Sequence, residues 1–121
     1  MQQSAKTSRD AQILVHDAIA RALDDLGVDT LFGLVGDANL YMVDKFTRLG
    51  GKHFVPVANE ASAVGAANGY AQATGRVGVA TVTHGPALTN TVTALVEAVK
   101  TTVPIVLIGS CLGSGGNSKV A

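Results

Sequence analysis

Helical and extended hydrophobic patterns alternate along the chain. Apolar residues recur every three or four positions in some stretches and form short uninterrupted runs in others, which is typical of amphipathic helices and of buried strands, respectively. Helices are predicted over residues 10–26, from about 40 to 49, over 60–74, and from about 88 to 100. Strands are predicted over residues 30–35, 53–57, 77–82 and 104–108. Each predicted strand therefore follows a helix.

Small and polar residues mark the ends of these elements. Gly27, the pair Gly50 and Gly51, and Gly75 each follow a helical stretch, at the position where a helix usually stops. Asn59 precedes the alanine-rich stretch 60–74 and is a favourable N-cap residue. Short apolar strands that alternate with helices are typical of a parallel sheet covered on both sides. The fold class predicted is doubly wound α/β.

Composition fits one compact domain. Of 121 residues, 47% are hydrophobic and 15% are charged, which is too apolar for a disordered chain. Nine basic and nine acidic side chains cancel, and no cluster of basic residues is interleaved with aromatic ones. The sequence therefore does not indicate binding to nucleic acid or to a membrane surface. A small molecule or another protein chain is the expected partner.

The sequence also favours a reducing compartment. The first twelve residues lack the apolar core of a signal peptide, and no apolar run approaches the roughly 18 residues that a membrane span needs. Cys111 is the single cysteine, so it has no partner for an internal disulfide or a zinc knuckle. A cytoplasmic location is expected.

Candidate chemistry lies where the predicted strands end, because ligands of open parallel sheets bind beyond the carboxyl ends of the strands. Glu60 is at such an end, and it is the only carboxylate in the apolar stretch 57–71. Acids are common in the first turn of a helix, where they interact favourably with its positive end. From its position alone, Glu60 is interpreted as a structural acid.

Other candidate residues also have structural explanations. Gly36 and Asp37 end a predicted strand, but this stretch has neither the dinucleotide-binding pattern nor a Walker loop. His84, next to Gly-Pro, is typical of a turn, and Cys111 has no base near it in the sequence. The Gly/Ser-rich stretch 113–119 lacks the Walker spacing and is expected to be a flexible tail.

Three segments taken together resemble a known family. They are FGLVGDANL at 32–40, NEASAVGAANGYA at 59–71, and THGPALTN at 83–90. In order and spacing they are similar to the pyrimidine-binding (PYR) domain of thiamine diphosphate enzymes, specifically the acetolactate synthase and pyruvate decarboxylase superfamily. The resemblance covers roughly residues 10–110.

The resemblance gives Glu60 a catalytic role. A glutamate at this position of the family motif hydrogen-bonds N1′ of the cofactor's aminopyrimidine and favours the tautomer whose 4′ nitrogen removes the thiazolium C2 proton. The cofactor then supports decarboxylation of a 2-oxo acid. By the same resemblance, eight further residues line the cofactor or shape the turns beside it: Val35, Gly36, Asp37, Asn59, His84, Gly85, Pro86 and Asn90.

The sequence departs from the family pattern in two turns. Many relatives have a second glycine after Gly-Pro, where this chain has Ala87, and many synthases have proline where this chain has Val35. These departures leave the substrate open.

The resemblance also implies that this chain holds only part of the cofactor, its aminopyrimidine end. Relatives bind the diphosphate and Mg²⁺ through a separate domain that carries a Gly-Asp-Gly motif, which does not occur here. Some relatives also bind FAD, which nothing in this sequence supports. The expected organisation is a truncated PYR-like domain at 10–112, incomplete at its C-terminal end, between flexible tails at 1–9 and 113–121. No metal ligand is predicted in this chain.

Two functions remain open. One is an enzyme half-site, part of a 2-oxo-acid decarboxylase or carboligase that is inactive alone and works as a homo-oligomer or with a diphosphate-binding partner domain. The other is a non-catalytic α/β binding or assembly domain that keeps only the fold.

Overall fold

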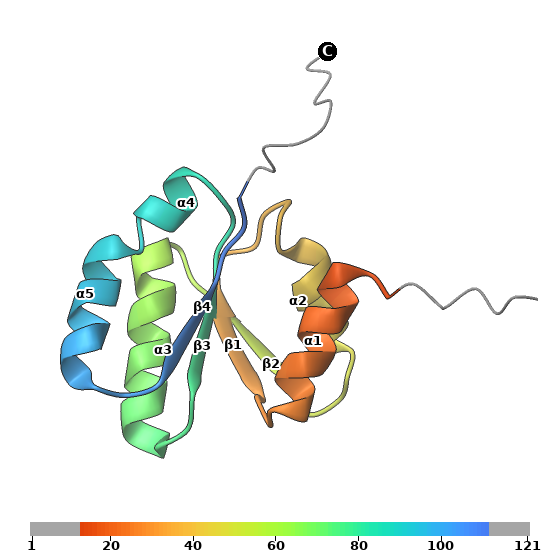
Figure 1. The fold of residues 1–121 in the computed structure, drawn as a ribbon, viewed down its shortest axis with the longest axis horizontal. Helices are drawn as coiled ribbons and strands as arrows, with labels where there is room; N and C mark the ends of the chain where they lie inside the picture. The colour runs from red at the N-terminus through yellow and green to blue at the C-terminus, as the bar shows by residue number, and fades with distance from the viewer. Residues whose placement is uncertain (1–12, 112–121) are drawn as a thin grey trace, which may run out of the picture.

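The computed structural model describes residues 13–111, and these contain one sheet of four parallel strands in the order β2-β1-β3-β4 (Figure 1). The strands are β1 (Thr30–Gly33), β2 (His53–Pro56), β3 (Gly78–Thr81) and β4 (Ile105–Ile108). In the register, Leu31 of β1 pairs with Phe54 of β2 on one side and with Val79 of β3 on the other. The chain therefore proceeds from β1 to one side of the sheet and then crosses to the other.

Helices cover both faces of the sheet. Figure 1 shows α1 and α2 on one face and α3, α4 and α5 on the other. Their bounds are α1 (Val15–Asp25), α2 (Leu40–Thr47), α3 (Glu60–Thr74), α4 (Pro86–Thr89) and α5 (Val92–Thr101). This arrangement confirms the predicted doubly wound α/β fold. Among residues 13–111, no helix has both the length and the apolar character that crossing a membrane requires.

The core has two parts, one on each face of the sheet. Because neighbouring residues of a strand point to opposite faces, Leu31 and Phe32 of β1 belong to different parts. Leu31 packs with residues of α1 and α2, including the fully buried Phe46. Phe32 packs with α3, including the fully buried Val64. The central strands β1 and β3 are thus covered on both sides.

The alanine content of α3 has a packing reason. Ala63 and Ala67 are completely buried, and a Cβ on Gly78 of β3 would lie 2.0 Å from the backbone oxygen of Ala67. The backbone of α3 therefore lies directly against β3. Because α3 follows the end of β2 in the chain, its first turn lies at the carboxyl edge of the sheet.

The first helix is shorter than predicted. It begins at Val15 rather than at residue 10, and Leu14, with φ −72° and ψ 143°, is extended. Ile13 and Leu14 are more than half exposed, so tertiary packing does not hold a further turn there. Residues 10–12 and the predicted tails at 1–9 and 113–121 lie outside the described residues.

The prediction of one helix from about residue 88 to residue 100 was wrong. Pro86, assigned to the preceding turn, instead begins α4, and the chain breaks before α5 begins at Val92. Thr91 at this break is fully buried, and its Oγ1 donates a hydrogen bond to the Leu88 carbonyl oxygen at 2.6 Å. Burial of this polar residue holds the break in place. The strands are also one or two residues shorter than predicted.

Candidate functional site

The carboxyl ends of all four strands lie at one edge of the sheet, because the strands are parallel. After β1 the chain continues to β2 on one side, whereas β3 lies on the other side of β1. This reversal is a topological switch point, where ligands bind in open α/β sheets. The loops that follow β1, β2 and β3 carry the residues singled out in the sequence.

Asn59 and Glu60 lie at the start of α3. The backbone of Asn59 is extended, and its Oδ1 accepts a hydrogen bond from the Ala61 amide at 2.8 Å. This is the predicted N-cap, and it makes Glu60 the first residue of the helix. The Glu60 carboxylate is partly buried at the helix end that favours negative charge.

Asn90 contacts Glu60 from a different helix. Asn90 Nδ2 donates a hydrogen bond to Glu60 Oε2 at 3.2 Å, across 30 positions of sequence. Sequence reasoning placed both residues near a cofactor but did not foresee that they touch. The structure therefore joins the end of the α4 segment to the start of α3.

Gly85 and Pro86 set the direction of the segment that carries Asn90. Gly85 has φ 60° and ψ −124°, a backbone conformation that residues with a Cβ rarely adopt. Pro86 occupies the first helical position, where its missing N–H costs nothing. These two residues turn the chain from the end of β3 into α4, as the sequence suggested for a turn.

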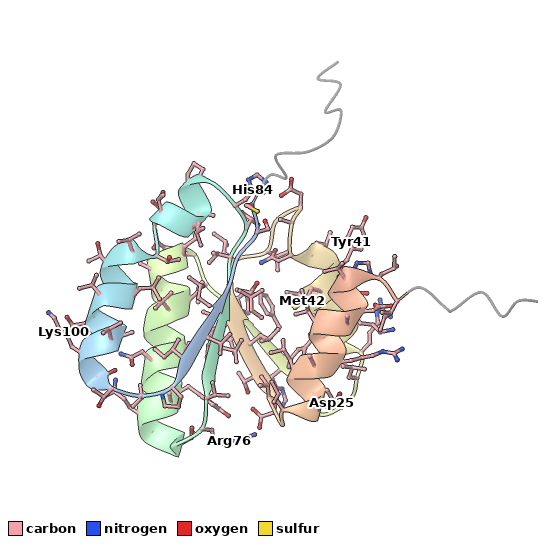
Figure 2. The ribbon with its side chains drawn as sticks, viewed as in Figure 1. Asp25, Tyr41, Met42, Arg76, His84 and Lys100 are labelled. Carbon is pink, nitrogen blue, oxygen red and sulfur yellow. The ribbon has the colours of Figure 1, made fainter. Side chains whose placement is uncertain are left out.

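Asp37 and His84 face each other across the switch point. His84 Nε2 lies 3.5 Å from Asp37 Oδ1. Figure 2 shows His84 at the same end of the sheet as the loop that follows β1. The Asp37 side chain is 83% exposed and that of His84 is 28% exposed, so Asp37 remains accessible to a ligand.

Val35 and Gly36 lie in the loop after β1. Val35 is 41% exposed. A Cβ on Gly36 would lie 2.4 Å from Cγ2 of Thr83, so glycine allows this loop to approach the loop after β3. Gly36 therefore shapes the site through its lack of a side chain.

Sequence reasoning missed Asn39. This residue is 4% exposed, its Oδ1 accepts from the Gly36 amide at 2.8 Å, and its Nδ2 donates to the Leu34 oxygen and to Thr81 Oγ1, both at 3.2 Å. It therefore holds the loop after β1 against β3. One feature of the sequence could have indicated this role. Asn39 comes directly before the helix predicted from residue 40, and asparagine in such turns often hydrogen-bonds to the local backbone.

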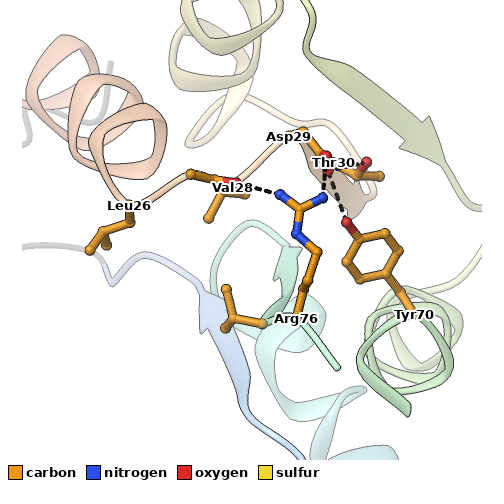
Figure 3. A pocket seen from close by; sticks show the side chains of 8 residues that line it. Leu26, Val28, Asp29, Thr30, Tyr70 and Arg76 are labelled. Atoms are coloured by element: carbon orange, nitrogen blue, oxygen red, sulfur yellow. Dashed lines mark hydrogen bonds and ion pairs between the residues drawn. The ribbon is translucent and has the colours of Figure 1, made fainter. Parts of the chain in front are cut away.

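Two cavities lie away from Glu60. One, of about 350 Å³, lies beside α1 and α2, with His16, Asn39 and Ser110 among its lining residues. The other, of about 230 Å³, is at the opposite edge of the sheet, around Asp29 and Arg76 (Figure 3). Glu60 lines neither cavity. The carboxyl edge around Glu60 is an open surface that can form one side of a binding site.

The acidic, histidine and cysteine side chains are spread over the described part of the chain. Residues 13–111 contain no group of three or more His, Cys, Asp or Glu side chains that could hold a metal ion. Cys111 is exposed. The residues that the fold does bring together at the carboxyl edge are the pair Glu60 and Asn90 and the pair Asp37 and His84.

Comparison with known proteins shows which family this chain belongs to. Residues 13–119 match the family described as thiamine pyrophosphate enzyme, N-terminal TPP binding domain. The chain is 41% identical over 104 residues to an acetolactate synthase of Mycobacterium bovis, covering 86% of this chain and 17% of that protein. It is 44% identical over 98 residues to the acetolactate synthase large subunit of Corynebacterium glutamicum, covering 81% of this chain and 16% of that protein.

A solved structure is also similar. A protein from Mycobacterium smegmatis, described as a putative thiamin diphosphate-dependent enzyme, matches with a TM-score of 0.72 and 29% identity, covering 82% of this chain and 19% of that chain. The chain thus spans less than a fifth of the length of the relatives it matches. The extent of the family match shows that the chain belongs to the thiamine pyrophosphate enzymes, as an N-terminal TPP binding domain related to that of acetolactate synthase.

Proposed function

We propose that this chain forms the pyrimidine-binding half of the active site in a thiamine diphosphate-dependent 2-oxo-acid decarboxylase or carboligase similar to acetolactate synthase. The observation that carries the proposal is the position of Glu60. It is the first residue of α3, at the carboxyl edge of a parallel sheet, in a chain of the thiamine pyrophosphate enzyme family. A helix-start acid in this setting faces the edge where such folds bind ligands.

The residues at this edge fit an aminopyrimidine ring. Such a ring has nitrogen atoms that donate and accept hydrogen bonds, and the edge offers the carboxylate of Glu60 beside the amide of Asn90. When bound, thiamine diphosphate supplies the electron-accepting thiazolium ring that makes loss of carbon dioxide from a 2-oxo acid possible. The role proposed for Glu60 is to share a proton with ring nitrogen N1′.

The other residues predicted from the sequence lie in the turns and loops at the same end of the sheet as this acid. Asn59 caps α3, and this makes Glu60 the first residue of the helix. The loops after β1 and β3 border the same edge, and we assign the following residues in them to the cofactor or substrate side of the site: Val35, Gly36, Asp37, His84, Gly85 and Pro86.

The rest of the cofactor, its diphosphate group with Mg²⁺, needs binding residues from another part of the enzyme. We propose that a separate domain, on the same polypeptide or on a partner, binds the diphosphate and Mg²⁺, and that the assembled enzyme is an oligomer. The 121-residue chain alone is expected to be inactive. We assign no residue of this chain to a flavin. The proposed location is the cytoplasm, which suits a chain with a single cysteine.

The test is the Glu60→Gln variant in the holoenzyme, meaning this chain together with the diphosphate-binding domain. Glutamine keeps the size of the side chain but cannot share a proton with N1′ in the same way. Exchange of the thiazolium C2 proton with deuterium, followed by NMR, should slow by about 10²–10⁴-fold. Binding of thiamine diphosphate, measured by calorimetry, should change little.

A matched control is Glu97→Gln on α5. Glu97 is an exposed acid paired with Lys100 at 3.2 Å, so this change removes the same charge away from the site. It should leave C2 exchange unchanged. A Glu60→Gln holoenzyme that binds the cofactor and exchanges the C2 proton at the wild-type rate would contradict the proposal and favour a non-catalytic binding or assembly domain.

A further inference from the structure

The hydrogen bond between Asn90 and Glu60 engages only one oxygen of the carboxylate. Asn90 Nδ2 donates to Oε2 at 3.2 Å, and within residues 13–111 the other oxygen, Oε1, makes no hydrogen bond. A hydrogen bond to one oxygen restricts the rotation of a carboxylate. The second oxygen then remains available for another partner in a defined place.

The backbone around Asn90 is itself held firmly. The Asn90 amide donates to the Pro86 oxygen at 2.9 Å, which closes α4. The next residue, Thr91, is fully buried, and its Oγ1 donates to the Leu88 oxygen at 2.6 Å. The Asn90 side chain therefore reaches Glu60 from a backbone that is fixed on both sides.

We propose that Asn90 is a positioning residue that holds Glu60 Oε2, so that Oε1 meets the ring nitrogen of the cofactor. This inference rests on the proposed function of Glu60. It replaces the expectation that Asn90 binds the cofactor directly. In this role, Asn90 acts on the rate of proton sharing through the geometry of Glu60, and it adds little to the affinity for the cofactor.

The affinity for thiamine diphosphate and the rate of C2 proton exchange distinguish a cofactor-binding role of Asn90 from a positioning role. A residue that touches the cofactor contributes to binding, so its loss raises the Kd for thiamine diphosphate. A residue that orients Glu60 affects the proton transfer, so its loss slows C2 exchange while the Kd stays nearly constant. Both quantities are measurable in the same holoenzyme.

The experiment compares Asn90→Ala and Asn90→Asp in the holoenzyme. Alanine removes the donor, and C2 exchange should fall roughly 10-fold with little change in cofactor Kd. Aspartate keeps the size of the side chain but places a second carboxylate against Glu60. Exchange in Asn90→Asp should therefore fall at least as far as in Asn90→Ala.

Asn90→Asp also separates positioning from a purely structural role. An acid just before α5 interacts favourably with the positive end of that helix but repels Glu60, so the two effects offset and this variant should unfold close to the wild-type temperature. A structural role for Asn90 predicts normal exchange in such a stable variant. Positioning predicts slow exchange in the same protein.

Asn68→Ala is a matched control. Asn68 Oδ1 accepts from Thr101 Oγ1 at 2.7 Å, so this variant also breaks a hydrogen bond made by α3, in this case between its middle and the end of α5. It should leave C2 exchange and cofactor Kd unchanged. Asn90→Ala should also have no further effect on exchange when Glu60 is already glutamine, because the two residues act as one unit.

The outcomes distinguish the two proposals. If Glu60→Gln slows exchange but both Asn90 variants exchange normally, the positioning role is wrong and the proposed function stands. If the Asn90 variants raise the cofactor Kd without slowing exchange, Asn90 binds the cofactor and the positioning role is again wrong. If Glu60→Gln exchanges normally, the proposed function fails and this inference fails with it.

Discussion

Arg76 donates a hydrogen bond to Asp29 at 2.5 Å and so ties the turn after α3 to the residue that precedes β1 (Figure 3). The same carboxylate accepts from the Tyr70 hydroxyl and from Thr30 Oγ1, both at 2.9 Å. These interactions lower the pKa of Asp29 to about 2, and the hydrogen bond from Arg76 contributes more to this shift than the two hydroxyl groups do. This cluster lies at the edge of the sheet opposite to Glu60, where it joins α3 to β1.

Asp29→Asn should lower stability at neutral pH. The side chains of Asp29 and Arg76 are 36% and 49% exposed, so solvent screening limits the loss to about 1 kcal/mol or less. Because folding depresses the pKa of Asp29, its ionised form stabilises the fold above about pH 4, and this contribution disappears as the pH falls towards 2. Urea unfolding of the two proteins across this range measures the difference.

The stability gap between wild type and Asp29→Asn should therefore close between about pH 4 and pH 2. Asp44→Asn is the control, since Asp44 pairs with Arg48 on an exposed surface of α2 and should have a smaller effect. A gap that stays constant down to pH 2 would mean that the charge of Asp29 does not stabilise the fold.

Gly78→Ala should destabilise the protein. A Cβ at this position would lie 2.0 Å from the Ala67 oxygen, so α3 must move away from β3, at a cost of about 1–3 kcal/mol. Gly65→Ala is the opposite case, because a Cβ there meets nothing within 4 Å and alanine favours helix by about 0.5–1 kcal/mol. Thermal unfolding should move the two variants in opposite directions, and equal effects would argue against close packing of α3.

Asn39→Ala should loosen the loop after β1. It leaves the Gly36 amide and the Leu34 oxygen without their hydrogen bonds in a mostly buried place, at a cost of about 1–3 kcal/mol. Asn39→Asp keeps the acceptor but loses both donors, so it should also destabilise. Chemical denaturation measures both changes, with Gln72→Ala on the exposed side of α3 as the neutral control. Wild-type stability of both Asn39 variants would show that solvent replaces these bonds.

The 121-residue chain alone should bind thiamine diphosphate weakly, and Mg²⁺ should add little. Diphosphate and Mg²⁺ contacts usually anchor such ligands, and we assign them to another domain. Calorimetry with and without Mg²⁺ measures this. Tight binding that depends on Mg²⁺ would show that this chain itself carries the anchoring site.

The chain should associate with itself or with a partner domain through α5. Val92, Val96 and Val99 lie on one side of this helix and are 54%, 56% and 76% exposed, which is unusual for large apolar residues so close together. Sedimentation should show association at micromolar concentration, weakened by Val96→Lys. A stable monomer under these conditions would contradict self-association through this surface.

Apart from the break between α4 and α5, the order and type of the elements were determined by the sequence alone, because hydrophobic periodicity and capping are local. Asn59 caps α3 as predicted, and Gly75, with φ 70°, ends it as predicted. Glu60 was placed correctly at the carboxyl edge for the same reason. Its catalytic role came from the resemblance to a family and remains a proposal.

Only the tertiary structure decided how distant segments meet. The break between α4 and α5 depends on burial of Thr91, and the contact of Asn90 with Glu60 spans 30 positions. Asn39 similarly reaches Thr81 across 42 positions. No local pattern encodes such contacts, since they depend on the order β2-β1-β3-β4 and on the helices that pack against that sheet. The sequence thus determined which residues reach the carboxyl edge of the sheet, and tertiary packing decided which of them touch.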